Sequence, residues 1–254
     1  MIDFKKYGGG GRGTTLDPSD LLKLFESLDR RTTHTELRPA QIEALRALSE
    51  SRAQRDHVLK VSTGAGKTTV GLLYLRSHAI EKGAPVVYLC PTAQLVGQVV
   101  AEAKALGLAA VDYPGGQPHP EAAGMTGEAI IVCTYKKLFV ANTTFDRVDV
   151  QLSPCALVLD DAHAGIEEVR DSFSMRLPAT SPVAQELTAL LEAPLKSFAP
   201  GPWSGVLQRD YAAIVDAPYW IWQPLVDQVR QILAAHADEK ELRFVWGHLR
   251  DRLE

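Results

Sequence analysis

The sequence predicts an α/β fold in which helices cover both faces of a parallel sheet. Four short apolar runs, at residues 58–61, 85–90, 129–134 and 156–160, have the length of strands. They lack the polar alternation of half-exposed strands, and segments with helical spacing of apolar residues separate them. Strands that are apolar on both sides and are joined through helices are typical of a parallel sheet.

The chain before this sheet is predicted to contain a mobile tip and two helices. Residues 5–13 are rich in glycine and have too little apolar content to pack. Asp17-Pro-Ser-Asp20 resembles a helix start, and residues 21–28 carry apolar side chains at helical spacing. A second helix is expected to follow residues 37–41. We therefore expect residues 1–35 to form a flexible tip and a helix.

The strand predicted at 58–61 leads into a glycine-rich turn and then a helix over 69–78. A strand, a glycine-rich turn and a helix in this order predict that the turn binds phosphate. Glycines let backbone N–H groups converge on phosphate oxygens, and the helix adds unpaired N–H groups and the positive end of its dipole. Lys67 would reach the β- and γ-phosphates, and the Thr68 hydroxyl would bind Mg²⁺. The predicted binding residues are Thr63, Gly64, Ala65, Gly66, Lys67, Thr68 and Thr69.

A second strand and helix follow, with a strand over 85–90 and a helix over 95–106. Residues 111–127 hold four glycines and three prolines and are predicted to be mostly loop. Ligands bind such sheets at the carboxyl ends of the strands, so residues directly after each strand are expected on one rim.

The last predicted strand ends in Asp160-Asp-Ala-His163. Two carboxylates at the end of an apolar strand are costly unless a cation or hydrogen-bond donors satisfy them. Asp160 is expected on the Mg²⁺ side of the site, and Asp161 is expected to position and polarise the attacking water. His163 is expected to hydrogen-bond between the site and a neighbouring element. The alternative for the acidic pair is a solvated loop.

Gln41, upstream of the glycine turn, has two interpretations. Its amide offers one donor and one acceptor to the edge of an adenine. A solvated helix glutamine would look the same in the sequence.

Residues 166–254 are predicted to form a mainly helical insertion or appended module. A short strand is expected over 172–177, and the four helices are expected near 182–193, 208–215, 224–235 and 239–253. Tyr219-Trp-Ile-Trp222, Trp203 and Trp246 concentrate aromatic residues here. Base stacking is an option for them, but aromatic residues at helical spacing more often pack in a core.

The chain resembles superfamily 2 helicases of the DEAD/DEAH-box type over about residues 36–165. Arg38-Pro-Ala-Gln41 is similar to the upstream glutamine motif, and Ser62–Thr68 is similar to motif I. Asp160-Asp-Ala-His163 is similar to motif II. Further similarity, to motifs Ia and Ib, involves Pro91, Thr92, Leu95 and Gln98, and then Thr134, Tyr135 and Leu138.

The resemblance implies that residues 36–165 form a RecA-like lobe with ATP and Mg²⁺ as cofactors. The implied roles are hydrolysis for Lys67, Thr68, Asp160 and Asp161, adenine recognition for Gln41, and a nucleic-acid-facing position for Pro91, Thr92, Thr134 and Tyr135. Asp161 stands where the family usually has glutamate. No Ser-Ala-Thr motif follows His163.

The resemblance implies that the protein is the ATP-binding lobe of an ATPase that translocates on or remodels nucleic acid. Single-stranded DNA or RNA is the expected partner. A second RecA-like lobe, in a longer chain or in a partner protein, would supply arginines for full hydrolysis. The alternative is a nucleotide-dependent switch or scaffold that binds ATP and a protein partner with little turnover. The acidic pair followed by Ala-His disfavours a P-loop kinase.

Composition sets outer limits on these interpretations. With a net charge of -4, the chain has no overall excess of basic residues, so nucleic-acid contacts are expected to be local. The three cysteines, Cys90, Cys133 and Cys155, lie far apart beside apolar runs, which predicts buried free thiols. The start of the chain does not resemble a signal peptide, and no apolar run reaches membrane-spanning length. We therefore expect a cytoplasmic protein that does not contact a membrane.

Overall fold

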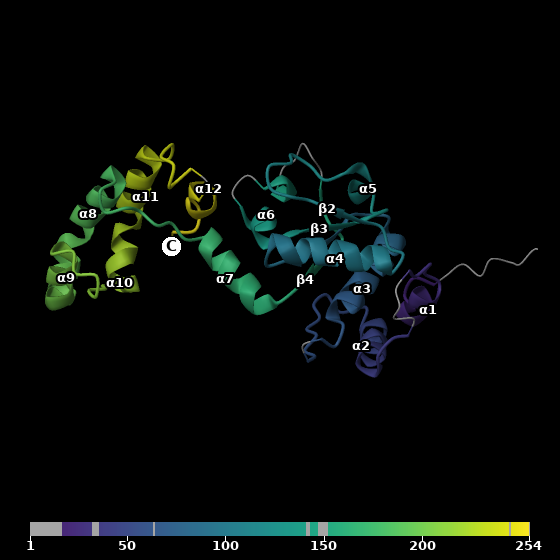
Figure 1. Ribbon diagram of the computed structural model, residues 1–254. Coiled ribbons are helices and arrows are strands. Elements are labelled where there is room, and N and C mark those ends of the chain that lie inside the picture. Colours follow the sequence, from purple (N-terminus) through teal and green to yellow (C-terminus); the bar gives the residue numbers. More distant parts are fainter. Residues whose placement is uncertain are drawn as a thin grey trace, which may run out of the picture. The chain divides into compact units, whose positions relative to one another are not determined.

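The computed structural model describes residues 17–31, 36–62, 64–140, 143–146, 152–243 and 245–253. Its contacts divide the chain into two units (Figure 1). The first unit comprises Met1–Thr134 and Val150–Asp161, and the second comprises Tyr135–Asp149 and Ala162–Glu254. The division expected from the sequence, at residues 35 and 165, stays a prediction. The glycine-rich tip at 5–13 lies outside the described residues.

A parallel sheet forms the centre of the first unit. Over the described residues its strand order is β2-β3-β1-β4, and every pairing is parallel. In β1, Val87 lies opposite Ile131 of β3 and opposite Leu157 of β4. The predicted α/β fold with a parallel sheet is confirmed. The strand bounds are Val86–Cys90 (β1), Ala110–Asp112 (β2), Ile130–Thr134 (β3) and Ala156–Leu159 (β4).

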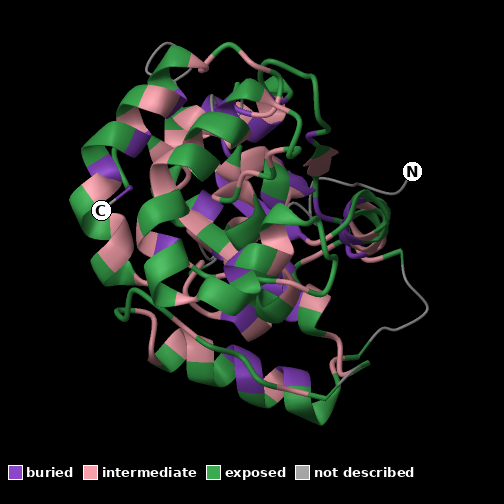
Figure 2. Ribbon diagram, turned by 90° about the vertical axis from the view of Figure 1, so that its left-hand side faces the viewer, coloured by how far each residue is buried: buried purple, intermediate pink, exposed green. Residues whose placement is uncertain are grey.

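Helices cover both faces of this sheet. Tyr88 of β1 and Val132 of β3 belong to a core that also contains apolar residues of α3 and α4. On the other face, a Cβ at Gly124 of α5 would lie only 2.8 Å from Ile131. Figure 2 shows buried and exposed residues alternating along the helices, as expected when each helix covers a core with one side. The helices are Leu21–Glu26 (α1), Pro39–Glu50 (α2), Lys67–Lys82 (α3), Ala93–Ala105 (α4) and Ala122–Met125 (α5).

Residues 58–61 do not form the predicted buried strand. They lie outside regular structure, and the Val58 side chain is 97% exposed. An extended apolar segment becomes a buried strand only when a neighbouring strand accepts its hydrogen bonds, and the local sequence does not encode that neighbour. In the described sheet β4 is an outer strand, and its Leu159 stays 51% exposed. The short strand β2, in contrast, was not predicted.

The second unit is helical, as predicted for the C-terminal segment. Val183 of α8 packs with Val229 and Leu233 of α11 in its core. The elements are Tyr135–Phe139 (α6), Thr144–Asp146 (η2), Ala162–Ser172 (α7), Pro182–Phe198 (α8), Pro200–Leu207 (α9), Tyr219–Trp222 (α10), Gln223–Leu225 (η3), Val226–Ala235 (α11) and Trp246–Leu249 (α12).

Three elements predicted in this unit were wrong. The helix expected over 239–253 is reduced to Trp246–Leu249 (α12), with turns before it. Ser172 ends α7, and residues 174–178 have no regular structure, so the strand over 172–177 does not form. Its alternating apolar residues, Met175 and Leu177, pack against the helical core instead. The helix over 208–215 is also absent, because Arg209 adopts a left-handed backbone conformation (φ 59°) directly after α9.

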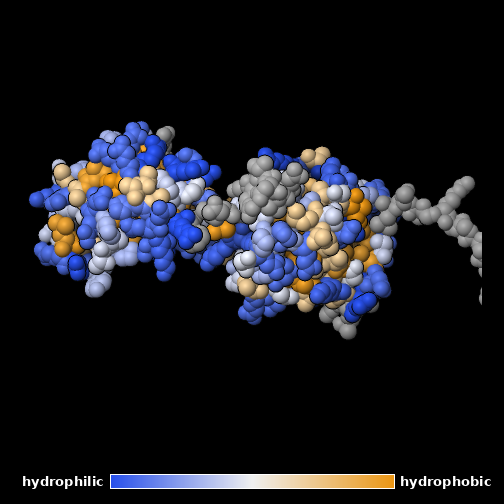
Figure 3. All heavy atoms as spheres, turned by 90° about the horizontal axis from the view of Figure 1, so that it is seen from above, coloured by the Kyte–Doolittle hydropathy of each residue, from blue (hydrophilic) through white to orange (hydrophobic). Residues whose placement is uncertain are grey.

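The aromatic residues of the second unit divide between core and surface. Trp203 is buried, and Trp222 and Trp246 pack against the core, which agrees with the favoured interpretation. Trp220 is 66% exposed and lies edge-on to Phe198, with ring centroids 6.1 Å apart. Figure 3 shows apolar residues reaching the surface among hydrophilic ones in this unit.

The cysteines follow the sequence prediction only in part. Cys90 and Cys133 are buried free thiols, whereas Cys155 is exposed because it precedes the outer strand β4. Within the residues that the structure describes, no helix has both the length and the apolar character needed to cross a bilayer.

A histidine joins α8 to the end of α11. His236 Nδ1 lies 2.6 Å from Glu239 Oε1, and His236 Nε2 lies 3.0 Å from Glu186 Oε1. The hydrogen bond to Glu186, followed by the one to Glu239, raises the pKa of His236. The protonated imidazole therefore stabilises this junction.

We predict that the second unit loses thermal stability as the pH rises above the unfolded-state histidine pKa of about 6.5. A histidine whose pKa is raised in the folded state contributes stability that is complete below the unfolded-state pKa. This stability is lost as the pH rises through the folded-state pKa. In a His236→Gln variant this pH dependence should be smaller, whereas His119→Gln should retain it. All four tryptophans lie at 203–246, so tryptophan fluorescence during thermal unfolding reports this unit. Identical pH profiles for wild type and His236→Gln would contradict the prediction.

Candidate functional site

The glycine turn before α3 has the backbone that its sequence predicts. Gly64 and Gly66 have φ values of 78° and 82°, a left-handed conformation that side chains disfavour. Ala65 N–H donates to Ser62 O at 3.2 Å, which closes the turn. Gly66 is the N-cap of α3, so the turn runs directly into a helix N-terminus with unpaired N–H groups. Thr63, also predicted to bind here, lies outside the described residues.

Two side chains from the start of α2 hold carbonyl groups of this turn. Arg38 Nη1 donates to Gly64 O, and Gln41 Nε2 donates to Gly66 O at 3.1 Å. Gln41 Oε1 accepts the Arg38 N–H at 2.8 Å. A Cβ at Gly66 would lie 2.1 Å from Gln41 Nε2, so this contact requires glycine.

The amide that was predicted to face adenine therefore contacts the turn in this structure. Gln41 is buried, with 7% of its surface exposed, and both ends of its amide have protein partners. Arg38 contacts the turn as well, although it was not among the predicted site residues. Its place at the start of the Arg38-Pro-Ala-Gln41 motif was the signal that could have identified it.

The three residues after Gly66 have different environments. Lys67 is exposed at the start of α3. Thr68 is half-buried and lies close to Tyr88 of β1. Thr69 is buried, and its Oγ1 donates to Glu102 Oε1 of α4 at 2.7 Å. The Thr69 side chain thus joins two helices, whereas Lys67 and Thr68 remain at the turn.

Strand β4 brings Asp160 to the same end of the sheet. Asp160 N–H donates to Leu89 O at 3.0 Å, so pairing with β1 continues past the end of β4. Burial raises the pKa of the Asp160 carboxyl, and the Lys67 charge partly opposes this shift. Lys67 and Asp160, 93 residues apart in the chain, therefore act on each other electrostatically.

Asp161 differs from Asp160 in exposure and in backbone conformation. Its side chain is exposed, and its φ of 50° lies in the left-handed region. Such a conformation costs free energy in a non-glycine residue and is concentrated at functional sites. The turn between β4 and α7 thus presents the second carboxylate to solvent.

The donor groups at this rim fit a magnesium ion bound together with phosphates. The Thr68 hydroxyl and the Asp160 carboxylate are hard oxygen donors, and Mg²⁺ is usually held by one or two such groups plus phosphate oxygens. A half-buried carboxylate with a raised pKa would be better stabilised by a nearby cation. Over the described stretches, no group of three or more His, Cys, Asp and Glu side chains could hold a metal by itself.

The remaining predicted residues lie after β1 and β3 or in the second unit. Thr92 is exposed and caps α4, since its side chain accepts the Leu95 N–H at 3.3 Å. Pro91 and Thr134 are half-buried. Tyr135 is only 1% exposed, because its ring packs against Gly165 of α7, and it does not present a face for base stacking here. His163 is exposed in α7.

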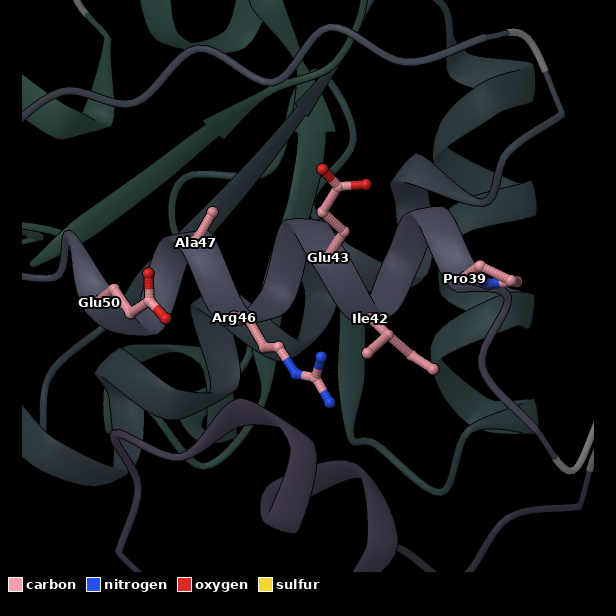
Figure 4. Close-up of a pocket in the computed structure, with 6 residues that line it drawn as sticks. All are labelled: Pro39, Ile42, Glu43, Arg46, Ala47 and Glu50. Atoms are coloured by element: carbon pink, nitrogen blue, oxygen red, sulfur yellow. The ribbon is translucent and has the colours of Figure 1, made fainter.

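A shallow hollow of about 530 Å³ lies along α2 (Figure 4). Its polar groups have mixed charge, and Gln41 lies on the buried side of the same helix. The hollow is therefore distinct from the glycine turn. Its lining residues are Pro39, Ile42, Glu43, Arg46, Ala47 and Glu50.

Comparison with known proteins places these features in one family. The family model for the DEAD/DEAH box helicase matches residues 38–191. The matched region includes α2, the glycine turn, the whole described sheet and the first helices of the second unit. A comparison with curated proteins found no match to this chain.

We predict that Asp160→Asn raises the unfolding midpoint of the ligand-free chain at pH 7. A folded-state carboxyl pKa above the unfolded value of about 3.9 means that the charged form destabilises the fold above that pH. Asparagine carries no charge, so the difference in unfolding midpoint between Asp160→Asn and wild type should disappear as the pH falls toward 4. Urea unfolding followed by far-UV circular dichroism measures the difference, with the exposed Asp112→Asn as a matched control. A lower midpoint for Asp160→Asn at pH 7 would contradict this assignment.

Proposed function

The chain belongs to the DEAD/DEAH box helicase family, and from this premise we propose that its first unit binds ATP with Mg²⁺ as the first RecA-like lobe of a nucleic-acid-dependent ATPase. The observation that carries the proposal is that Lys67, directly after the glycine turn, interacts electrostatically with Asp160 at the carboxyl end of β4. Such an arrangement combines a phosphate-binding backbone with a cation and a carboxylate.

Each group has a defined role in this proposal. The N–H groups of the turn and of the first turn of α3 bind phosphate oxygens, and Lys67 adds a positive charge. Thr68 and Asp160 hold Mg²⁺, which when bound stabilises charge on the phosphates. Asp161, exposed beside Asp160, orients the attacking water. Arg38 and Gln41 hold the turn through hydrogen bonds to its carbonyl groups. When the nucleotide is bound, Gln41 contacts adenine.

Single-stranded nucleic acid is the proposed second ligand. Pro91, Thr92 and Thr134 follow or end β1 and β3, at the same rim of the sheet as Asp160. Thr92 is exposed and offers a hydroxyl to a phosphate. With a net charge of -4, binding would depend on such local contacts.

Full hydrolysis is proposed to require a second RecA-like lobe, in a longer chain or in a partner protein. Charge develops around the γ-phosphate during transfer, and an arginine that stabilises it contributes about 10³- to 10⁵-fold in rate.

We predict that Lys67→Ala weakens Mg-ATP binding by about 1.5–3 kcal/mol, or roughly 10- to 150-fold, the scale of a charge-assisted hydrogen bond. The fold should be retained, because Lys67 is exposed in the absence of nucleotide. Calorimetric titration with Mg-ATP measures the change, and the exposed Lys60→Ala is the matched control. Equal affinities for wild type and Lys67→Ala would disprove the proposed phosphate site.

We also predict that the two aspartates separate binding from turnover. Asp160→Asn should weaken Mg²⁺-dependent ATP binding, whereas Asp161→Asn should bind normally and lose hydrolysis in any assembly that turns over ATP. Binding is measured by calorimetry, and turnover by phosphate release with and without single-stranded DNA or RNA. Similar loss of binding in both variants would show that their roles are wrongly assigned. Normal ATP binding by wild type without turnover in any assembly would indicate a nucleotide-dependent switch.

A further inference from the structure

The second unit exposes a group of large apolar side chains around α9 and α10. Soluble monomers rarely expose a contiguous apolar patch of more than a few hundred Å² unless it serves an interaction. Helix α10 has the sequence Tyr-Trp-Ile-Trp but contains no fully buried residue. We call the group the aromatic surface, and its residues are Phe198, Leu207, Tyr211, Ile214, Tyr219 and Trp220.

Helix α10 lies beside the end of α8. The Phe198 ring, at the end of α8, is edge-on to Trp220 of α10, with ring centroids 6.1 Å apart. Helix α9 begins two residues after Phe198 and has eight residues, so Leu207 at its end lies within about 20 Å of Phe198. These segments therefore present their exposed apolar side chains in one region of the unit.

The chain that follows α9 folds back onto this helix. Asp210 N–H donates to Gly205 O at 2.9 Å, and a Cβ at Gly205 would lie 2.7 Å from Cβ of Ala213. Tyr211 and Ile214 directly follow these two contacts in the chain, so they extend the same region. Tyr211 is fully exposed and Ile214 is 76% exposed, which leaves both available to a partner.

The apolar area of this surface matches one side of a protein–protein interface. A fully exposed aromatic side chain offers about 150–250 Å², so the four aromatic residues, which are 51–103% exposed, present roughly 400–700 Å². A standard interface covers about 800 Å² of each partner, and about 57–65% of that area is non-polar. The aromatic surface is therefore large enough for a stable dimer.

The charges around the surface favour a second copy of the chain over nucleic acid. Residues 196–222 contain two basic and two acidic side chains, which are Lys196, Arg209, Asp210 and Asp216. Binding to a phosphate backbone requires an excess of basic groups, which this segment lacks. A surface with equal numbers of both signs can be complementary to itself, because a twofold axis lets a basic group of each copy face an acidic group of the other.

We propose that the aromatic surface joins two copies of this chain in a symmetric dimer. Tyr211 and Trp220 are its main anchors, since tyrosine and tryptophan side chains carry much of the binding energy of protein interfaces. The proposal goes beyond the proposed ATP site and does not depend on it.

Sedimentation velocity of the full chain without nucleotide, from low to high micromolar concentration, tests the proposal. Wild type should pass from monomer to dimer, and Tyr211→Ser should raise the dissociation constant about tenfold or more. The Tyr211 side chain is fully exposed, so this change should leave the monomer folded, which circular dichroism checks. Ile214→Ser should also weaken the dimer. Ile166→Ser is its matched control, because Ile166 is an exposed isoleucine of the same unit, in α7 and outside the aromatic surface.

A second measurement follows the burial of Trp220. Its side chain is 66% exposed, so quenching of tryptophan fluorescence by acrylamide should decrease as the dimer forms.

Three outcomes would overturn the proposal. One is a wild-type chain that stays monomeric at the highest concentration. Another is a dimer that Tyr211→Ser and Ile214→Ser leave unchanged, because a different surface then forms it. The third is a monomeric chain that binds single-stranded DNA or RNA and loses this binding in Tyr211→Ser, which would identify a base-stacking surface instead. Since dimerisation is measured without nucleotide, failure of ATP binding would count against the proposed function alone.

Discussion

The parallel pairing of β1 with β3 and β4 is the constraint on which the rest of the first unit depends. It aligns the carboxyl ends of the strands, so that chain segments far apart in sequence leave the sheet at one rim. The hydrogen bond from Asp160 N–H to Leu89 O extends this alignment to the first acidic residue. Without that pairing, Asp160 would have no defined position beside the residues that follow β1 and β3.

Helix α3 places the residues that follow the glycine turn near the aligned strand ends. Its packing against β1 and β4, which Gly71 permits, brings Lys67 within electrostatic range of Asp160 and brings Thr68 to Tyr88. Several of these features oppose stability: an interior helix glycine, a half-buried carboxylate and a left-handed Asp161. Their concentration at one rim is typical of a functional site, where local rules of folding are broken for binding or chemistry.

Side chains at the start of α2 also hold the glycine turn. Arg38 and Gln41 satisfy the carbonyls of Gly64 and Gly66, so the turn is held before any nucleotide is bound. A turn that is already ordered loses less conformational entropy on binding. The residue pattern that suggested adenine recognition thus also contributes to the organisation of the phosphate site.

The sequence by itself determined the α/β class, the glycine turn and the acidic residues, because apolar periodicity and glycine spacing are local properties of the chain. It could not determine that 58–61 would remain outside the sheet, or that Met175 and Leu177 would pack on helices, since both outcomes depend on which partner is available. Only the tertiary structure placed Tyr88 at Thr68 and Gln41 at Gly66. These contacts join residues from different elements, and no local pattern specifies which side chains will meet across a packed interface.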